Sequence, residues 1–407
     1  MTTRDQDIAD VIDGGITTAE GFRAAAVPCG IKKDALDFAL IVSDEPASAV
    51  GVFTTSRAIA APVLVCREHL DRSGGLARAI AVNSGCANAC TGDAGMAAAR
   101  QMAEAVAAAV ACPLEQTLVA STGVIGLPLE ITKIRSGITA AANGLDRSSG
   151  HAAAEAIMTT DLGPKETAVL VRTPSGSFVI GGMVKGSGMI EPMMATMLGF
   201  ITTDASIDSV RLRQALLSVT DETFNAITVD GECSTNDSVF LLANGASGVT
   251  VDDAVYPEFV AGLRRVCSVL AREIVRGGEG ATKLVTINVT GANTHDDAKQ
   301  AARAIANSPL VKTAIHGGDP NWGRLVAVAG RAGVGFELRH ARVRIGPAVL
   351  YENDTVWADR EPEAAEHMRG HEVDVDVDLG TGGDGEATVL TCDLSAEYVR
   401  INADYRT

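Results

Sequence analysis

Short apolar, β-branched runs alternate along the chain with alanine-rich segments of helical length. Runs of about four to eight such residues predict strands, and apolar residues at helical spacing predict helices. The predicted strands are 48–54, 61–66, 78–83, 166–172, 178–184, 196–202, 237–243, 284–290, 341–346 and 372–378. The predicted helices are 93–111, 129–142, 151–158, 207–219, 254–275 and 295–306. This order contains no regular βαβ repeat, so it predicts an α/β (α+β) protein with substantial sheet.

Polar segments separate these elements. Residues 1–20 are polar and acidic, which predicts a loosely held amino-terminal arm. Glycine, serine and asparagine gather at 83–92, 121–126, 185–188, 231–237, 277–280 and 316–323. Loops of this composition are where backbone groups can approach a ligand, so candidate site residues are sought there.

Composition narrows the classes of protein to consider. The 407 residues carry a net charge of -17 and no run of lysine and arginine, which argues against nucleic-acid binding. No uncharged apolar stretch of about 18 residues occurs, and the start lacks a basic segment followed by an apolar one, so we expect a cytoplasmic protein without membrane contact. The eight cysteines form no C-x-x-C pair, which predicts reduced thiols and no zinc site.

Three stretches look like known ligand-binding motifs but lack residues that those motifs require. The alternating aspartates of 374–378 lack the glycine and final glutamate of a calcium loop, so they predict a strand with one solvated face. The glycines of 277–280 do not have phosphate-loop spacing, and Gly186-Ser187-Gly188 lacks the third glycine of a dinucleotide loop. No helical histidine pair and no G-x-S-x-G elbow occur.

The stretch 185–198 reads Lys-Gly-Ser-Gly-Met-Ile-Glu-Pro-Met-Met-Ala-Thr-Met-Leu, a glycine loop with one lysine that leads into a strand. It resembles the self-cleavage segment of the ornithine acetyltransferase family, the bifunctional glutamate N-acetyltransferases of the cyclic arginine pathway. The resemblance runs from residue 21 to residue 407. Its other blocks lie at 83–92, 121–126, 158–161, 230–237, 278–283 and 319–324.

The chemistry that the resemblance implies begins with cleavage between Ala195 and Thr196. A threonine hydroxyl is a weak nucleophile that needs an adjacent base. Attack of the Thr196 hydroxyl on the Ala195 carbonyl, followed by hydrolysis, would leave a free α-amino group beside that hydroxyl. With a pKa of roughly 7.7–8.0, this amine can serve as general base and acid, so one cleavage creates nucleophile and base together.

The resemblance also implies roles for residues elsewhere. Thr122 and Gly123 match the family's oxyanion hole, a hydroxyl and a backbone N–H. The matching substrate-binding positions are Thr159, Lys185, Thr196, Glu279, Asn402 and Thr407, with Lys185 near a substrate carboxylate and Glu279 near a substrate ammonium. No metal and no cofactor is implied, although acetyl-CoA stays open as a second acetyl donor.

The implied activity is ping-pong transfer of acetyl from N2-acetyl-L-ornithine to L-glutamate through an acetyl-Thr196 ester. Two alternatives stay open: a self-cleaving amidohydrolase or aminopeptidase on a similar scaffold, and a paralogue that serves a secondary-metabolite route. A binding protein that has kept the fold is disfavoured, because Thr122, Gly123, Lys185 and Thr196 occur together.

The implied fold is a layered α/β/β/α sandwich of the amino-terminal-nucleophile type with a carboxy-terminal α/β lobe. Residues 1–195 would form an α chain and 196–407 a β chain, with 196–284 completing the sandwich and 285–407 forming the lobe. Family members pair two such units, so the implied assembly is an α2β2 heterotetramer.

Overall fold

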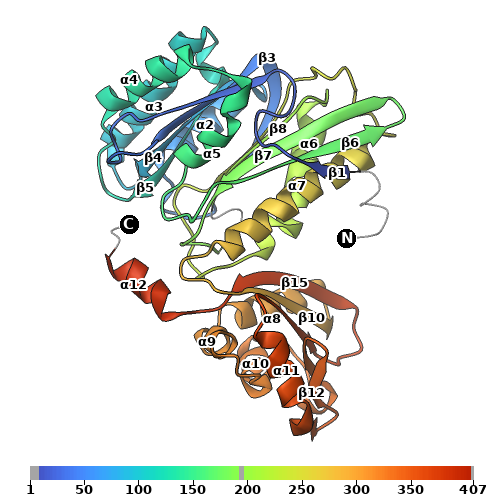
Figure 1. The fold of residues 1–407 in the computed structure, drawn as a ribbon. Coiled ribbons are helices and arrows are strands. Elements are labelled where there is room, and N and C mark those ends of the chain that lie inside the picture. The colour runs from blue at the N-terminus through green and yellow to red at the C-terminus, as the bar shows by residue number, and fades with distance from the viewer. Residues whose placement is uncertain (1–8, 192–196, 405–407) are drawn as a thin grey trace.

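Two sheets organise the protein, and the computed structural model describes residues 9–191 and 197–404 (Figure 1). The larger sheet contains β1 (Ala9–Ile12), β2 (Phe22–Val27), β3 (Phe38–Phe53), β4 (Leu76–Cys86), β5 (Thr117–Val124), β6 (Lys165–Thr173), β7 (Gly176–Lys185), β8 (Leu198–Thr203) and β9 (Ser238–Ala243). Its order is β1-β6-β7-β8-β9-β3-β4-β5, with β2 paired to β3. The helices around it are α2 (Ala61–Arg72), α3 (Gly92–Val110), α4 (Ile131–Asn143), α5 (Gly150–Ala156), α6 (Ser209–Glu222) and α7 (Tyr256–Arg276).

The long strand β3 belongs to both halves of the larger sheet. Its exposed residues 44–46 coincide with a break in register against β4, between Val42 and Ala47. Before the break β3 pairs with β2 and β4, and after it Ser48 to Phe53 pair with β9. The sheet therefore folds back on itself into two stacked layers.

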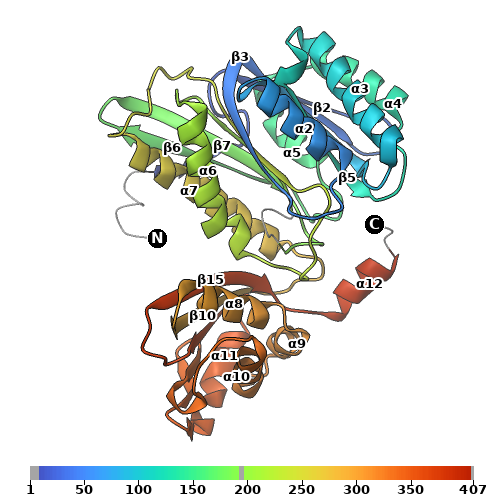
Figure 2. The same cartoon turned by 180° about the vertical axis from the view of Figure 1, so that it is seen from behind.

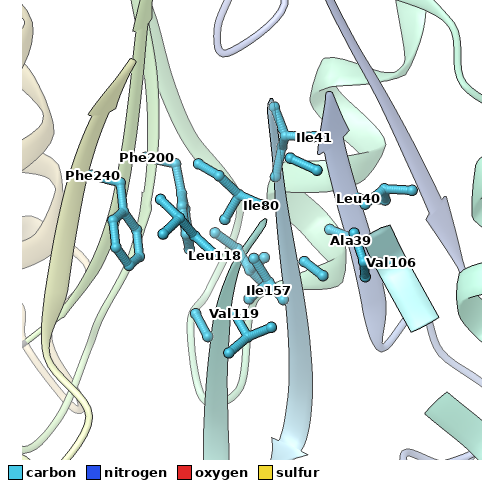
Figure 3. Packing of buried hydrophobic residues seen from close by; sticks show 14 of the residues in the cluster. Ala39, Leu40, Ile41, Ile80, Val106, Leu118, Val119, Ile157, Phe200 and Phe240 are labelled. Atoms are coloured by element: carbon cyan, nitrogen blue, oxygen red, sulfur yellow. The ribbon is translucent and has the colours of Figure 1, made fainter. Parts of the chain in front are cut away.

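Alternating side chains fill the space on either side of each layer. Phe200 and Phe240 from β8 and β9 face Ile80 and Leu118 from β4 and β5, and all four are fully buried (Figure 3). The other face of the β6–β9 layer packs on α6 and α7, whereas α2 to α5 cover the opposite layer (Figure 2). This arrangement confirms the predicted α/β fold of four layers, with helices outside and the two layers of the larger sheet inside.

A second sheet forms a lobe from Leu284 onward, with strand order β13-β12-β11-β14-β10-β15. Its strands are β10 (Leu284–Ala292), β11 (Arg342–Ile345), β12 (Ala348–Glu352), β13 (Thr355–Val356), β14 (Glu372–Asp378) and β15 (Gly385–Cys392). Its helices are α8 (His295–Ala306), α9 (Pro309–Gly317), α10 (Trp322–Arg331) and α11 (Glu361–Met368). The last helix, α12 (Ala396–Asp404), leaves the lobe and reaches back toward the larger unit (Figure 1).

Two sequence predictions were wrong. Residues 61–66 begin helix α2 rather than form a strand, because Pro62 at its first turn and a buried face of Val63, Cys66 and His69 suit a helix. The amino-terminal arm is not loosely held from residue 9 onward, because β1 pairs with β6 and Ile16 is fully buried.

The predicted loops at 83–92 and 121–126 begin as strand, because β4 runs to Cys86 and β5 to Val124. The aspartates of 374–378 lie in β14 with Val373, Val375 and Val377 buried, which confirms the predicted strand. Among the described residues, no helix is both long and apolar enough to span a bilayer.

Candidate active site

A cavity of about 150 Å³ lies where β5 and β7 end and β8 and β9 begin. Charged and hydroxyl-bearing side chains share this wall about equally with apolar ones, which is unusual for a space between two sheet layers. Residues from eight separate segments line it, among them Thr122, Gly123, Thr159, Lys185, Gly188, Met197, Asp230, Asn236, Asp237, Glu279, Tyr398 and Asn402.

Thr122 and Gly123 form the end of β5. Lys185 Nζ donates to Thr122 Oγ1 over 3.2 Å, and no acceptor in 9–191 or 197–404 takes the Thr122 hydroxyl hydrogen. That hydrogen is therefore available to a ligand in the cavity. Gly123 has φ +126°, and a Cβ there would lie 2.4 Å from the Gly85 carbonyl carbon, so only glycine fits at this irregular end of the β4–β5 pairing.

Lys185 ends β7 with its ammonium group in the cavity wall. Besides Thr122, it donates to Thr159 Oγ1 over 2.9 Å, and both acceptors are neutral hydroxyls. Burial lowers the pKa of Lys185, while Asp161, Asp237 and Glu279 act in the opposite direction. An ammonium group with three donors and two neutral partners keeps one donor for an anionic ligand group.

Asp161 holds the Lys185 loop in place. Its carboxylate accepts from Lys165 Nζ over 2.6 Å, from Gly186 N over 2.8 Å and from Thr159 N over 3.1 Å. Burial alone would raise the pKa of Asp161, but Lys185, Lys165 and these hydrogen bonds lower it to about 2. The carboxylate is thus ionised and sets the geometry of Thr159 and Lys185.

Glu279 stands on the loop after α7 and is 7% exposed. Asn402 Nδ2 donates to its carboxylate over 2.7 Å, and its own N–H donates to the Ser187 carbonyl over 2.8 Å. Within the described chain no cation pairs with Glu279, so a substrate ammonium would find an acceptor there. A Cβ at Gly188 would lie 2.4 Å from this carboxylate, so the close approach requires glycine.

Asp230 secures the segment that leads to the predicted cleavage site. Its carboxylate accepts from the N–H groups of Met189 and Ile190 over 2.7 and 2.8 Å, and Tyr398 Oη donates to it over 3.2 Å. Met189 adopts φ +55°, which turns successive N–H groups toward one acceptor. Helix α12 is thereby tied to the cavity through Tyr398 as well as Asn402.

Asn236 joins the 231–237 loop to the end of β5. Its side-chain amide donates to the Ala87 carbonyl over 2.6 Å and to the Ser121 carbonyl over 2.9 Å. The neighbouring Asp237 is buried in the cavity wall, and its Oδ2 has no hydrogen-bond partner among the residues described. The loop therefore positions Thr122 and adds the Asp237 carboxyl group to those of Asp230 and Glu279 in the cavity wall.

Six residues predicted from the sequence meet at this cavity: Thr122, Gly123, Thr159, Lys185, Glu279 and Asn402. Ala195, Thr196 and Thr407 lie outside the described residues. Sequence reasoning missed Asp161, Asp230, Asp237 and Tyr398. The three aspartates stand inside motif blocks quoted above, whereas Tyr398 lies outside every one of these blocks. In the described part of the chain, no cluster of three histidine, cysteine, aspartate or glutamate residues could hold a metal.

The fold and the site define a class: a layered α/β enzyme with charged and hydroxyl groups in a cavity between the two layers of its larger sheet. Comparison with known proteins identifies the family. The chain belongs to the ArgJ family, whose model matches residues 23–407, and this confirms the resemblance found in the sequence.

Relatives span the whole chain. The arginine biosynthesis bifunctional protein ArgJ of Dehalococcoides mccartyi is 48% identical, over 97% of this chain and 98% of its own. A protein of the same name from Bacillus cereus is 43% identical over 100% of both chains. Among solved structures, the arginine biosynthesis bifunctional protein ArgJ from Bacillus halodurans is 42% identical with a TM-score of 0.50, and it covers 52% of this chain and 100% of its own.

Proposed function

We propose that this protein is a bifunctional acetyltransferase of arginine biosynthesis that moves acetyl from N2-acetyl-L-ornithine to L-glutamate. Its family membership gives the pathway and enzyme class. The observation that carries the reaction type is the meeting of Thr122, Lys185 and Glu279 at one cavity beside the start of β8. A hydroxyl donor, an ammonium and a carboxylate are what an acyl transfer between charged amino acids requires.

The nucleophile in this proposal is Thr196, released by cleavage after Ala195. Met197, the residue that follows Thr196 in the sequence, lines the cavity, and this supports the assignment. The solved Bacillus halodurans chain has about half the length of this one, a share close to that of either product of cleavage at this bond. The α-amine of Thr196 supplies the base, so the mechanism needs no cofactor.

Transfer then proceeds in two half-reactions. Thr196 Oγ attacks the acetyl carbonyl, Thr122 and Gly123 stabilise the oxyanion, and the amine passes the proton to departing ornithine. Lys185 donates to Thr122, so it also strengthens this donor, whether or not it contacts a substrate carboxylate. Glutamate enters and removes the acetyl group by the reverse steps. Thr159, Glu279, Asn402 and Thr407 orient the two amino acids.

The two cleaved segments stay one unit in this proposal, because β7 and β8 pair from Ile180–Thr203 to Lys185–Leu198 across the break. Two such units form an α2β2 heterotetramer in the cytoplasm, in keeping with the family resemblance. Sedimentation of the purified enzyme tests the assembly.

The decisive assay follows N-acetylornithine consumption with and without glutamate. Glutamate-dependent turnover with formation of N-acetylglutamate supports the proposal, whereas equal turnover in its absence identifies an amidohydrolase. Replacing N-acetylornithine by acetyl-CoA in the same assay determines whether the second donor is used.

A further inference from the structure

The two amino acids of the proposed reaction have side chains of opposite charge, and the cavity wall matches the charges of only one of them. N-Acetylornithine carries a carboxylate and a side-chain ammonium group, which suit Lys185 and Glu279. Glutamate has a second carboxylate where ornithine has that ammonium group. Among the described residues that line the cavity, Lys185 is the one cation, whereas Asp230, Glu232, Asp237 and Glu279 are acidic. The second carboxylate therefore needs a cation from just outside this wall.

The loop between β2 and β3 brings a second lysine to the edge of the cavity. The Lys32 side chain crosses the end of β4, where a Cβ added at Gly85 would lie 3.0 Å from Lys32 Cγ. Its Nζ donates to the Met158 carbonyl over 3.1 Å. Gly85 pairs with Gly123, and Met158 directly precedes Thr159. Since Gly123 and Thr159 both line the cavity, the Lys32 side chain lies beside its wall.

A buried carboxylate fixes the backbone from which this side chain extends. Asp37 is fully buried and accepts from four successive N–H groups of the loop, those of residues 29–32, over 2.5 to 3.0 Å. Successive N–H groups that share one acceptor leave the loop little freedom. Lys32 is therefore positioned before any ligand arrives, which lowers the entropy that binding would cost.

The Lys32 ammonium group has donors to spare for a ligand. It has three donors, and the Met158 carbonyl is its one acceptor within 9–191 and 197–404. No carboxylate of these two ranges forms an ion pair with it. The nearby Lys165 differs, because it is buried against the Asp161 carboxylate over 2.6 Å. Lys32 is thus the lysine that can accept a charged partner from outside the chain.

The charges around Lys32 favour an anionic ligand. Burial lowers the pKa of Lys32, Asp37 and Asp161 raise it, and Lys185 lowers it further. The two ammonium groups therefore repel each other, and a ligand with two carboxylates would relieve that repulsion.

We propose that Lys32 binds the side-chain carboxylate of the acceptor and so makes the second half-reaction specific for glutamate. This inference rests on the proposed function. Lys185 binds the carboxylate that both amino acids share, and Lys32 binds the one that only glutamate has. Neighbouring residues hold the two cations, since Lys32 donates to Met158 and Lys185 donates to Thr159 over 2.9 Å. N-Acetylornithine does not use Lys32, because its ammonium group lies at Glu279.

Acceptor preference measures this role, with glutamine as the uncharged analogue of glutamate. In the full-length enzyme, Lys32→Met keeps a side chain of similar length over Gly85 and removes its charge. Its kcat/KM for glutamate should fall about tenfold or more relative to its kcat/KM for glutamine, the usual cost of losing a hydrogen bond between charged groups. Its kcat/KM for N-acetylornithine should stay within about twofold of the wild type. Lys32→Arg keeps the cation and should keep most of the preference for glutamate.

Lys33→Met is the matched control, because Lys33 is the exposed neighbour of Lys32 on the same loop. It should show the wild-type preference. Both acceptors are assayed on one preparation, so a variant that folds only in part still gives a valid ratio.

An unchanged ratio in Lys32→Met overturns the role, as does the same loss in Lys33→Met. An equal loss for glutamate, glutamine and N-acetylornithine also overturns it, because that result is what a purely structural lysine would give. A wild-type enzyme that transfers acetyl to neither acceptor overturns the proposed function itself, and so the two failures are distinguishable.

Discussion

Thr122 shows how a single hydroxyl is prepared for chemistry at the residue scale. Lys185 donates to its oxygen, so its hydrogen points to whatever occupies the cavity. The hydroxyl of an ordinary buried threonine donates to a backbone carbonyl, as the Thr223 hydroxyl does to the Val219 carbonyl.

Thr122→Val should reduce kcat by about 100- to 1000-fold and leave KM within a few-fold, because one oxyanion donor is lost. Thr122→Ser keeps the hydroxyl and should retain most of the activity. Steady-state kinetics per mole of cleaved enzyme measures both. Equal activity of the valine and serine variants would remove Thr122 from the oxyanion hole.

The ionised Asp161 carboxylate should make the stability of the folded protein depend on pH in the acid range. Its pKa falls from 3.8 to about 2 on folding, which corresponds to about 2 kcal/mol of stability. Because the folded-state pKa is the lower one, this contribution is complete above about pH 4 and is lost as pH falls toward 2.

Asp161→Asn should therefore be less stable than the wild type at about pH 6, and the gap should narrow between about pH 4 and pH 2. Denaturant midpoints at several pH values measure it. If the difference in stability between the two proteins does not depend on pH, the charge of the Asp161 carboxylate does not stabilise the fold.

At the scale of the elements, the ends of the strands determine where the cavity lies. The sequence predicted two of the strands around it, 178–184 and 237–243, because each is a short apolar run. It missed β2, β5 and β15, whose small or polar residues take their stability from neighbouring strands, which no local pattern reports. The 61–66 run was misread for the related reason that a short buried helix and a strand have similar composition.

The close approach of β4 and β5 at Gly85 and Gly123 leads us to expect a contrast between two glycines with positive φ. Gly123→Ala should cost about 2 kcal/mol or more and abolish activity, because its Cβ would overlap the Gly85 backbone. Gly126 has φ +81°, and a Cβ added there would have no other heavy atom within 4 Å, so Gly126→Ala should cost only about 1 kcal/mol. Thermal unfolding compares them, and equal losses would contradict the overlap argument.

The contact of helix α12 with Glu279 leads us to expect that this helix contributes to substrate binding. Asn402→Ala removes the only described partner of the Glu279 carboxylate and should raise KM about tenfold with little change in kcat. Val399→Ala, at an exposed position of the same helix, is the control and should behave like the wild type. If both variants bind substrate normally, α12 has no part in recognition.

At the scale of the whole molecule, the predicted break divides one core between two chains. Phe200 and Phe240 from the second segment pack against Ile80 and Leu118 from the first, so burial rather than charge holds the halves together (Figure 3). The sequence could identify the segments and the family blocks, but not this packing, because the contacts join residues far apart in the chain. Nor could it find Asp161 and Asp230, because many of their partners are backbone N–H groups that only the fold brings into place.

The two segments should therefore elute together in gel filtration at about 1 M salt, where ion pairs between exposed groups are screened. Separation of the two chains under those conditions would show that the shared core does not hold them.

The central claim is that Thr196 becomes the amino terminus of a working acetyl carrier. The most direct measurement is mass spectrometry of enzyme mixed with N-acetylornithine and quenched in acid before glutamate is added. We predict two chains, 1–195 and 196–407, with one acetyl group on Thr196 of the second, and its loss once glutamate is present. An active enzyme that remains a single chain, or that carries no acetyl group on Thr196, would contradict the account.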